Sequence, residues 1–293
     1  MQITVPATSA NLGPGFDTLG LALNLRNEVC IKPSSFLSIS TRGEGEESPK
    51  IKKNTLFLNV FHRHYRRLGG KDETFRFEFI NRIPISRGMG SSSAVIVAAI
   101  TAAYVVAGAK YNKRSILNLA LRHEPHPDNI TPCVMGGFNV ACVEGSRVFS
   151  KKRRLPPHLR AVMVVPDRRI STSRSRHVLP KSYSKEELVY SLSRAAYMTA
   201  LFMSESWDQL RIAAKDKIHQ DRRMRMMPEL VEVQKIALEN GALMSTLSGS
   251  GSSFLSLCYE DDAAGISVAL QNRFSHFRVM TFELDNHGVI AKG

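Results

Sequence analysis

A run of glycines and serines that leads into an apolar segment has the clearest chemical potential in this sequence. The run consists of Pro84, Ile85, Ser86, Arg87, Gly88, Met89, Gly90, Ser91, Ser92 and Ser93, and the apolar residues 94–109 follow it. Glycines let the backbone approach a ligand closely, and the first turn of a helix offers free N–H groups and a partial positive charge that suit a phosphate. The serine hydroxyls could bind phosphate oxygens or a metal ion, or they could simply cap the helix.

The run departs from two common phosphate-binding motifs. The Walker A motif would need a lysine before Ser91, and the dinucleotide fingerprint would need a glycine in place of Ser93. The run therefore indicates an anion site but neither of those two nucleotide folds.

Two other polar segments carry side chains suited to binding or catalysis. One spans residues 6–21, is rich in glycine and proline, and contains Asn11 and Asp17. The other spans residues 124–129 and contains, around two prolines, Glu124, His126, Asp128 and Asn129. Loops often carry functional groups, although Asn and Asp also bond to their own backbone in turns. We expect both segments to be loops, and the prolines should keep the second out of a helix interior.

Composition bounds the class of protein. The chain has 293 residues, of which 43% are hydrophobic and 23% charged, which is typical of a globular protein with room for two domains. The apolar segment 94–109 is shorter than the roughly 20 residues that cross a bilayer, so it predicts a buried helix and no membrane partner. The first residues lack the basic and apolar regions of a signal peptide, which predicts a cytoplasmic protein.

Charge and cysteine spacing argue against two further classes. The net charge of +14 is scattered, and its two clusters, residues 151–154 and 222–225, lack interleaved aromatic residues. We therefore expect anionic small molecules rather than nucleic acid as partners. The four cysteines are widely spaced without zinc-ligand patterns, so they should be reduced thiols.

In the first half of the chain, the spacing of hydrophobic residues predicts a sheet with helices. Residues 2–5, 27–41 and 75–79 are expected strands, and residues 54–68 and 112–123 are expected helices with Asn54 and Asn112 as caps. Residues 136–143 form a further expected strand. The glycine-serine run thus lies between a strand and a buried helix.

The second half of the chain predicts a smaller α+β unit. The basic, proline-containing stretch 145–160 is the expected boundary, which gives domains 1–158 and 159–293. Residues 168–180 are an expected loop, and Ser184 and Glu187 form a capping box. The remaining expected helices cover residues 184–202, 205–217, 228–241 and 261–273, and the expected strands cover 161–165, 242–246, 253–258 and 277–283.

Three loops together resemble the three motifs of the GHMP kinases, in the same order and at similar spacing. They are residues 6–17, 84–93 and 247–253. Within that family, Pro-Ala-Thr-Ser-Ala-Asn-Leu-Gly at 6–13 and His-Pro-Asp-Asn at 126–129 are similar to the homoserine kinases. The chain departs from the usual pattern at Met89, Pro125, Asp221 with Arg222, and Ser252.

The resemblance implies an α+β, two-domain kinase. Its N-terminal domain would be like domain 2 of ribosomal protein S5, and its C-terminal domain would be ferredoxin-like. The enzyme would use ATP and Mg²⁺, with the phosphates held by residues 84–93 and the metal held by Ser92 and Glu124. Asn54 would lie near the adenine. A glycine-serine loop at 248–252 would support the site from the second domain.

The resemblance also implies L-homoserine as the substrate, phosphorylated on its side-chain hydroxyl on the way to threonine. An amino acid needs a carboxylate for its ammonium and arginines for its carboxylate. The matching positions are Asn11, Asp17, His126, Asn129, Thr172, Arg176 and Arg223. Asn129 would contact the reacting hydroxyl beside Asp128, and a homodimer would match many family members.

Several choices stay open at the level of sequence. Arg222 adjoins Arg223 and could be the clamp instead, and either Asp17 or Asp128 could be a general base, or there could be none. A kinase acting on a sugar or a mevalonate-type acid is the alternative enzyme. A basic binding protein that keeps the fold without catalysis is the alternative class.

Overall fold

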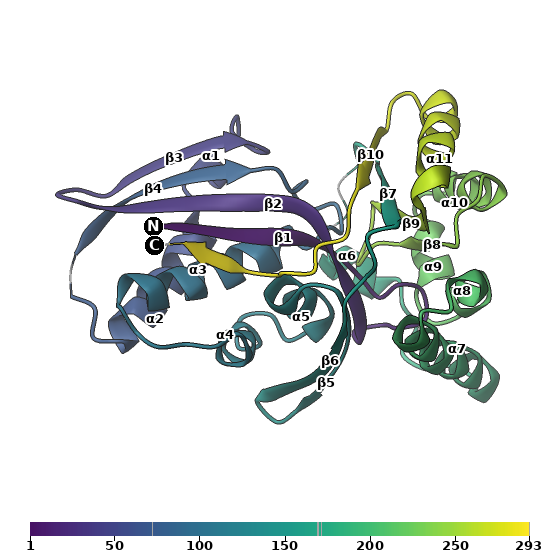
Figure 1. Ribbon diagram of the computed structural model, residues 1–293, viewed down its shortest axis with the longest axis horizontal. Helices are drawn as coiled ribbons and strands as arrows, with labels where there is room; N and C mark the ends of the chain where they lie inside the picture. Colours follow the sequence, from purple (N-terminus) through teal and green to yellow (C-terminus); the bar gives the residue numbers. More distant parts are fainter. Residues whose placement is uncertain (72, 169, 171, 293) are drawn as a thin grey trace.

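Two β-sheets, each covered by helices, divide the molecule into two lobes (Figure 1). The computed structural model describes residues 1–71, 73–168, 170 and 172–292, without the side chains of Lys50 and Thr172. This α+β arrangement confirms the expected fold class. No helix in the described ranges has both the length and the apolar character needed to cross a membrane.

The first sheet is built around two long antiparallel strands. Its order is β11-β1-β2-β4-β3, and β5 and β6 extend from β2. The strands are β1 (Gln2–Ala10), β2 (Leu19–Ser34), β3 (Ser38–Gly43), β4 (Thr74–Asn81), β5 (Phe138–Glu144), β6 (Arg147–Arg153) and β11 (Ile290–Lys292).

Helices of the first lobe cover one face of this sheet (Figure 1). They are α2 (Thr55–Arg67), α3 (Ser91–Val106), α4 (Lys113–Ala120) and α5 (Pro127–Met135), whereas the single turn α1 (Pro49–Lys52) lies beside β3. The central helix α3 packs against α2, α4, α5 and β1, and most of its residues are buried. This confirms the buried helix that the apolar segment predicted.

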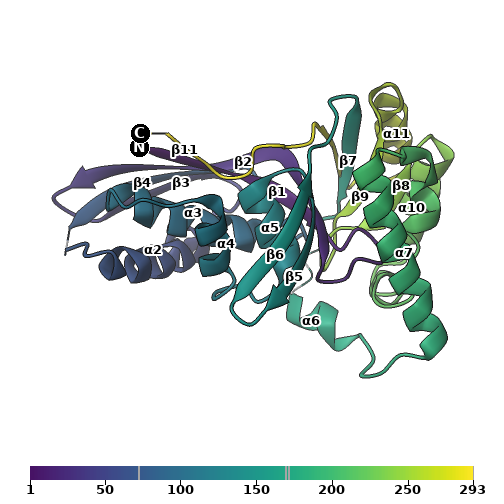
Figure 2. The same cartoon turned by 60° about the horizontal axis from the view of Figure 1, so that its bottom comes forward.

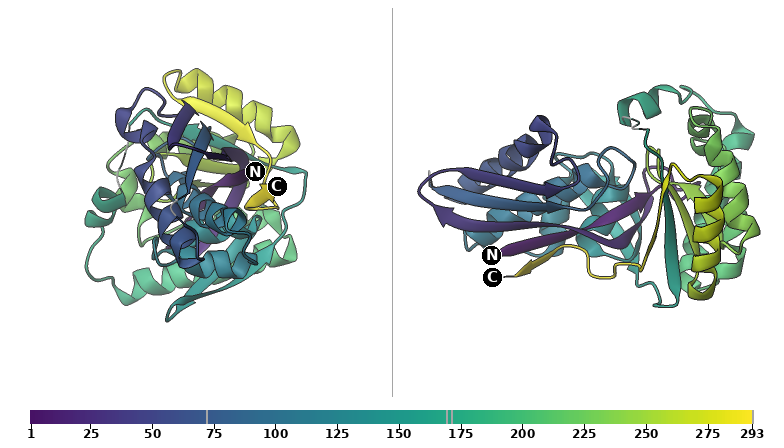
Figure 3. Two further views of the ribbon diagram at one scale, coloured as in Figure 1. Left: turned by 90° about the vertical axis from the view of Figure 1, so that its left-hand side faces the viewer. Right: turned by 90° about the horizontal axis from the view of Figure 1, so that it is seen from above.

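The second sheet has the order β10-β7-β9-β8, with antiparallel neighbours. Its strands are β7 (Leu159–Val165), β8 (Met244–Leu247), β9 (Phe254–Tyr259) and β10 (Arg278–Phe282). The helices of this half are α6 (Thr172–His177), α7 (Lys185–Ser204), α8 (Leu210–Ala213), α9 (Gln220–Met224), α10 (Glu229–Glu239) and α11 (Glu260–Arg273), with a 3-10 turn, η1 (Trp207–Gln209). Helices α10 and α11 pack on this sheet at the side away from the first lobe (Figure 3). Helix α7 meets the first lobe, where the Phe202 ring stacks on the Phe138 ring with centroids 4.0 Å apart, and Figure 2 shows α6 near the junction of the lobes.

The end of the chain returns to the first lobe. Strand β11 pairs with β1, so both termini lie side by side in the first lobe (Figures 1 and 3). The proposed division at residues 158 and 159 falls between β6 and β7, and it remains a prediction. A unit defined by the first sheet would include this last strand as well.

Several elements differ from the sequence expectations. Strand β1 runs on to Ala10 and β2 begins at Leu19, so the expected loop at 6–21 shrinks to its middle. Pro6 is tolerated because the register shifts there, at a β-irregularity. The basic stretch 145–160 contains the edge strand β6. Its charged residues face solvent, so the sequence showed no hydrophobic pattern from which a strand could be predicted.

Three helical regions also differ from the expectations. Residues 168–180 contain α6 instead of a continuous loop, and the expected helix 205–217 is split into η1 and α8. Helix α5 begins at Pro127, so Asp128 and Asn129 lie in a first turn. Proline is accepted at that position because its missing N–H would be unpaired there anyway.

Candidate active site

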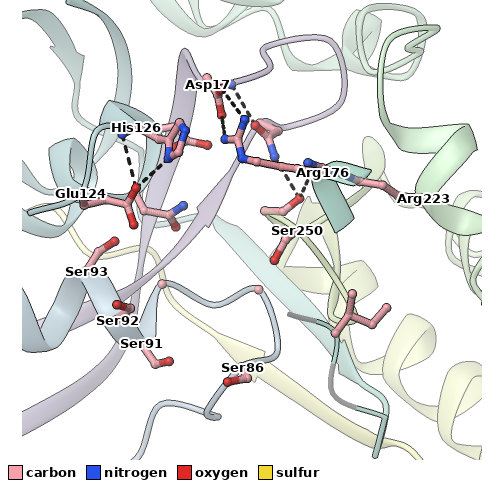
Figure 4. A pocket seen from close by; sticks show the side chains of 17 residues that line it. Asp17, Ser86, Ser91, Ser92, Ser93, Glu124, His126, Arg176, Arg223 and Ser250 are labelled. Carbon is pink, nitrogen blue, oxygen red and sulfur yellow. Dashed lines mark hydrogen bonds and ion pairs between the residues drawn. The ribbon is translucent and has the colours of Figure 1, made fainter. Parts of the chain in front are cut away.

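A cavity of about 240 Å³ lies where the polar loops of the first lobe meet α6 and α9 (Figure 4). It is lined by most of the residues that the sequence singled out. These are Asn11, Asp17, Ser86, Gly88, Gly90, Ser91, Ser92, Ser93, Glu124, His126, Asp128, Asn129, Arg176 and Arg223. Three further residues, Ile170, Gly249 and Ser250, complete the lining.

The serines at the start of α3 do not cap the helix. The N-cap is Gly90, in a left-handed conformation with φ of 68°, and no side chain accepts a hydrogen bond there. The first-turn N–H groups therefore have no capping side chain, and the three serines lie along the cavity (Figure 4). Of the two interpretations left open by the sequence, the anion site agrees with this geometry.

The two glycines of this loop are required by close packing as well as by backbone angle. A Cβ on Gly88 would lie 2.1 Å from the Ser248 carbonyl oxygen, and a Cβ on Gly90 would lie 2.0 Å from Thr8 Oγ1. The loop is thus pressed between β1 and the glycine-serine loop of the second lobe. Ser248 Oγ donates to the Gly88 carbonyl at 2.7 Å, and the Ser253 N–H donates to the Arg87 carbonyl at 2.8 Å.

Five of the predicted nucleotide residues lie outside the cavity lining. Met89 is fully buried in the core beneath the loop, and Asn54 donates from Nδ2 to Thr41 Oγ1 at 2.9 Å. Arg87 is buried, with Nη2 3.8 Å from Asp167 Oδ1. The other two are Pro84 and Ile85. Their contacts with a nucleotide remain predictions.

Glu124 and His126 form a hydrogen-bonded pair just before the N-terminus of α5. Glu124 Oε1 lies 2.7 Å from His126 Nδ1 and also accepts from the His126 backbone N–H at 3.3 Å (Figure 4). The bond between the two side chains raises the pKa of His126. In the described part of the chain, no three His, Cys, Asp or Glu side chains gather to hold a metal. A single carboxylate beside serine hydroxyls suits Mg²⁺, which takes few protein ligands and completes its shell with water and phosphate oxygens.

Asp128 is a buried carboxyl group facing the cavity. It is 4% exposed, and its Oδ1 has no hydrogen-bond partner among the described residues. Burial raises its pKa to about 7, with a further contribution from the negative charge of Asp17. Such a group can exchange a proton near neutral pH.

Asp17 and Asn11 occupy the loop between β1 and β2. Asp17 accepts two hydrogen bonds from Arg176, and Asn11 Oδ1 accepts from the Asp17 N–H at 3.0 Å. Asn11 also donates from Nδ2 to the Gly249 carbonyl at 2.9 Å. Asn11 therefore joins the two lobes at the cavity wall, in addition to any contact with a ligand.

The structure separates the two neighbouring arginines. Arg223 is 3% exposed and lines the cavity, with Nη1 donating to the Gly249 carbonyl at 3.1 Å. Burial, and then Arg176, lower its pKa to about 10. Arg222 instead donates to Glu187 Oε1 at 2.7 Å, away from this lining. The geometry thus favours Arg223 over Arg222 as the clamp, whereas the Thr172 side chain lies outside the described residues.

Some residues at the site gave no usable signal in the sequence. Ile170 is apolar and was not singled out, and Thr8 lay in a segment expected to be a loop. His219 makes two buried hydrogen bonds: Nε2 donates to the Gly13 carbonyl at 2.7 Å, and Nδ1 accepts from Arg223 Nη1 at 3.2 Å. Gly249 and Ser250, in contrast, lie in the glycine-serine loop 248–252 that the family resemblance had placed at the site.

Comparison with known proteins decides the family. Residues 55–137 match the GHMP kinases N terminal domain, and residues 198–276 match the GHMP kinases C terminal domain. The homoserine kinase of Sulfurovum sp. (strain NBC37-1) is 73% identical over 292 residues, which cover 100% of both chains. This chain belongs to the GHMP kinase family, as its three loops had indicated.

Other relatives of this GHMP kinase carry the same name. The homoserine kinase of a Nitratiruptor species is 58% identical over 100% of both chains. The crystal structure of homoserine kinase from Cytophaga hutchinsonii superposes with a TM-score of 0.88 at 26% identity, and the match covers 99% of this chain and 96% of that one. As a family member, the chain is an ATP-using small-molecule kinase.

Proposed function

We propose that this chain is a homoserine kinase, which transfers the γ-phosphoryl group of ATP to the side-chain hydroxyl of L-homoserine and so serves threonine biosynthesis. The observation that carries the proposal is one cavity with two chemically different ends. The start of α3 suits phosphates, and the group formed by Asp17, Arg176 and Arg223 suits an amino acid. Full-length relatives named homoserine kinase support the same conclusion.

We assign the nucleotide phosphates to the loop 84–93, with Gly88, Gly90 and Ser91 as phosphate contacts, and Mg²⁺ to Ser92 and Glu124. The metal, when bound, would neutralise charge on the phosphates. Glu124 is held by its bond to His126, which keeps the carboxylate at the cavity. The adenine position near Asn54 remains a prediction.

On binding, the substrate would replace the ion pair between Asp17 and Arg176 with its own charged groups. Its ammonium would bind Asp17 and its carboxylate would bind Arg176 and Arg223, with Asn11, His126 and Thr172 nearby. The zwitterion of an amino acid carries one charge of each sign, so it can replace the Asp17–Arg176 pair without leaving either residue unpaired.

The reaction needs alignment and a route for one proton. The hydroxyl oxygen forms a bond to the γ-phosphorus while the bond from that phosphorus to the β–γ bridging oxygen breaks, and ADP leaves. Asn129 would contact the hydroxyl. Asp128, with its pKa near 7, is the carboxylate that we propose for the released proton.

The deciding experiment measures ADP release with a panel of alcohols. We expect L-homoserine to be preferred strongly over mevalonate, galactose and 3-amino-1-propanol, which lacks the carboxylate. A preference for mevalonate or a sugar would favour the alternative kinase. ATP binding without turnover of any alcohol would favour the noncatalytic alternative.

We also propose a cytoplasmic location and a homodimer. The four cysteines are free thiols, as in a reducing compartment. Helix α7 exposes Leu188, Val189 and Leu192, an apolar face that a second copy could cover. Light scattering of the purified protein tests the oligomeric state.

A further inference from the structure

Thr8 in β1 bonds to the residue that we place at the reacting hydroxyl. Its side chain is fully buried, and Oγ1 donates to Asn129 Oδ1 at 2.7 Å. The two residues are 121 positions apart in the chain. Thr8 has no role among the phosphate, metal and substrate positions described above.

The surroundings hold this bond in place. The Thr8 N–H donates to the Met89 carbonyl at 3.2 Å, which ties β1 to the phosphate loop. A Cβ on Gly90 would lie 2.0 Å from Thr8 Oγ1 and 3.1 Å from Asn129 Oδ1. Glycine at position 90 therefore leaves the space in which Thr8 and Asn129 meet, directly at the start of α3.

The bond determines which end of the Asn129 amide can serve the substrate. An amide has an acceptor oxygen and a donor NH₂ group. Because the bond to Thr8 turns Oδ1 towards β1, the NH₂ group on the other branch of the amide is the end presented to a ligand in the cavity that Asn129 lines. Asn129 then offers the reacting oxygens a hydrogen-bond donor, and a neutral amide is too weak a base to take the hydroxyl proton.

We propose that Thr8 is a positioning residue, which orients the Asn129 amide so that Nδ2 faces the reacting oxygens. The inference rests on the proposed phosphorylation of a hydroxyl at this cavity. Two adjacent residues in the first turn of α5 then have different roles. Asn129 donates to the reacting oxygens, and the unpartnered Oδ1 of Asp128 is available to accept the proton.

Thr8→Val removes the hydroxyl while keeping the side-chain shape. We expect kcat to fall about 10- to 100-fold, the range for losing one to two well-placed hydrogen bonds in a buried site, with KM for ATP and homoserine within about 2-fold of wild type. Thr8→Ser restores the donor and should recover kcat to within about 3-fold. Ser9→Ala is the matched control, because Ser9 is equally buried in β1 and its hydroxyl has no partner among the described residues.

A double-mutant cycle separates positioning from a general structural effect. If Thr8 acts through Asn129, then Thr8→Val in an Asn129→Ala background should lower kcat by less than about 2-fold further. The proposal would be overturned if the double variant lost kcat by the product of the two single-variant losses, or if Thr8→Val alone kept the wild-type kcat. Melting temperature and calorimetric ATP binding report whether each variant is folded.

A second substitution tests the idea without altering β1. Asn129→Asp keeps an acceptor for Thr8 but removes the donor, so we expect its kcat to be as low as that of Asn129→Ala. An active Asn129→Asp enzyme would show that the donor is unnecessary and would overturn the proposal. If wild type prefers another alcohol, the homoserine assignment fails, and the same cycle measured with that alcohol still tests Thr8.

Discussion

Arg176 holds the carboxylate of Asp17 with two hydrogen bonds, from Nη2 to Oδ1 at 2.7 Å and from Nη1 to Oδ2 at 3.1 Å. Arg176 comes from α6 and Asp17 from the loop after β1, so the pair joins the two sides of the cavity. The ring of Phe16 lies 5.2 Å from the Arg176 guanidinium and 5.1 Å from that of Arg223. The pair brings together opposite charges that match the two ends of an amino acid.

Asp17→Asn should weaken homoserine binding while leaving ATP binding nearly unchanged. The ammonium loses its charged partner, which is worth about 1.5–3 kcal/mol as a charge-assisted bond, or roughly 10- to 150-fold in KM. Steady-state kinetics with each substrate varied checks this. An unchanged KM for homoserine would mean that Asp17 serves Arg176 alone.

Arg223→Leu should raise KM for homoserine by at least about 30-fold, because removing one side of a buried charged pair costs about 2–5 kcal/mol. ATP binding should stay close to wild type. Arg222→Leu is the control, since Arg222 pairs with Glu187 away from the cavity lining. A sensitive position 222 beside a tolerant 223 would contradict our placement of the clamp, and melting curves must show that Arg223→Leu folds.

Glu124→Gln should lower kcat by about 100-fold or more, because it removes the charge proposed for Mg²⁺ while keeping the side-chain volume. It should also lower the pKa of His126, whose bond to Glu124 raises it. Turnover assays at several Mg²⁺ concentrations and NMR titration of His126 provide the two readouts. Normal turnover together with a lowered His126 pKa would reject the metal role of Glu124 and would still support its hydrogen bond to His126.

The kcat/KM for homoserine should rise with pH through about 7. The raised pKa of Asp128 means that its carboxyl is protonated below that pH and ionised above it, and only the ionised form can take the proton. Asp128→Asn should have low activity without this pH-dependent limb. The same limb in Asp128→Asn would assign it to another group.

Stability should fall as pH drops from about 6.5 towards about 4 because of His219. Burial lowers its folded pKa to about 4, so the neutral form is favoured in the folded state and the stabilisation is complete above the unfolded value near 6.5. The shift corresponds to at most about 3 kcal/mol. Denaturant unfolding of wild type and His219→Gln at pH 7 and pH 5 should show a smaller pH effect in the variant, and equal pH effects would contradict the assignment.

Much of the local structure followed from the sequence by itself, because local physics decides it. The expected N-cap at Asn112 and the expected capping box of Ser184 with Glu187 marked helix starts, since each cap side chain accepts from the N–H three residues on. The alternating phenylalanines of β4 and the unbroken apolar run of α3 marked a half-buried strand and a buried helix. The three glycine-rich loops indicated the family through their residue types and spacing alone.

Only the tertiary structure decided which side chains meet. Arg222 and Arg223 are indistinguishable as neighbours in sequence, but consecutive residues of a helix point in different directions, so only Arg223 reaches the cavity. The pairing of β11 with β1 and the bond from Thr8 to Asn129 join segments far apart in the chain. Such contacts depend on how sheets and helices pack together, and no local pattern of residue types specifies that packing.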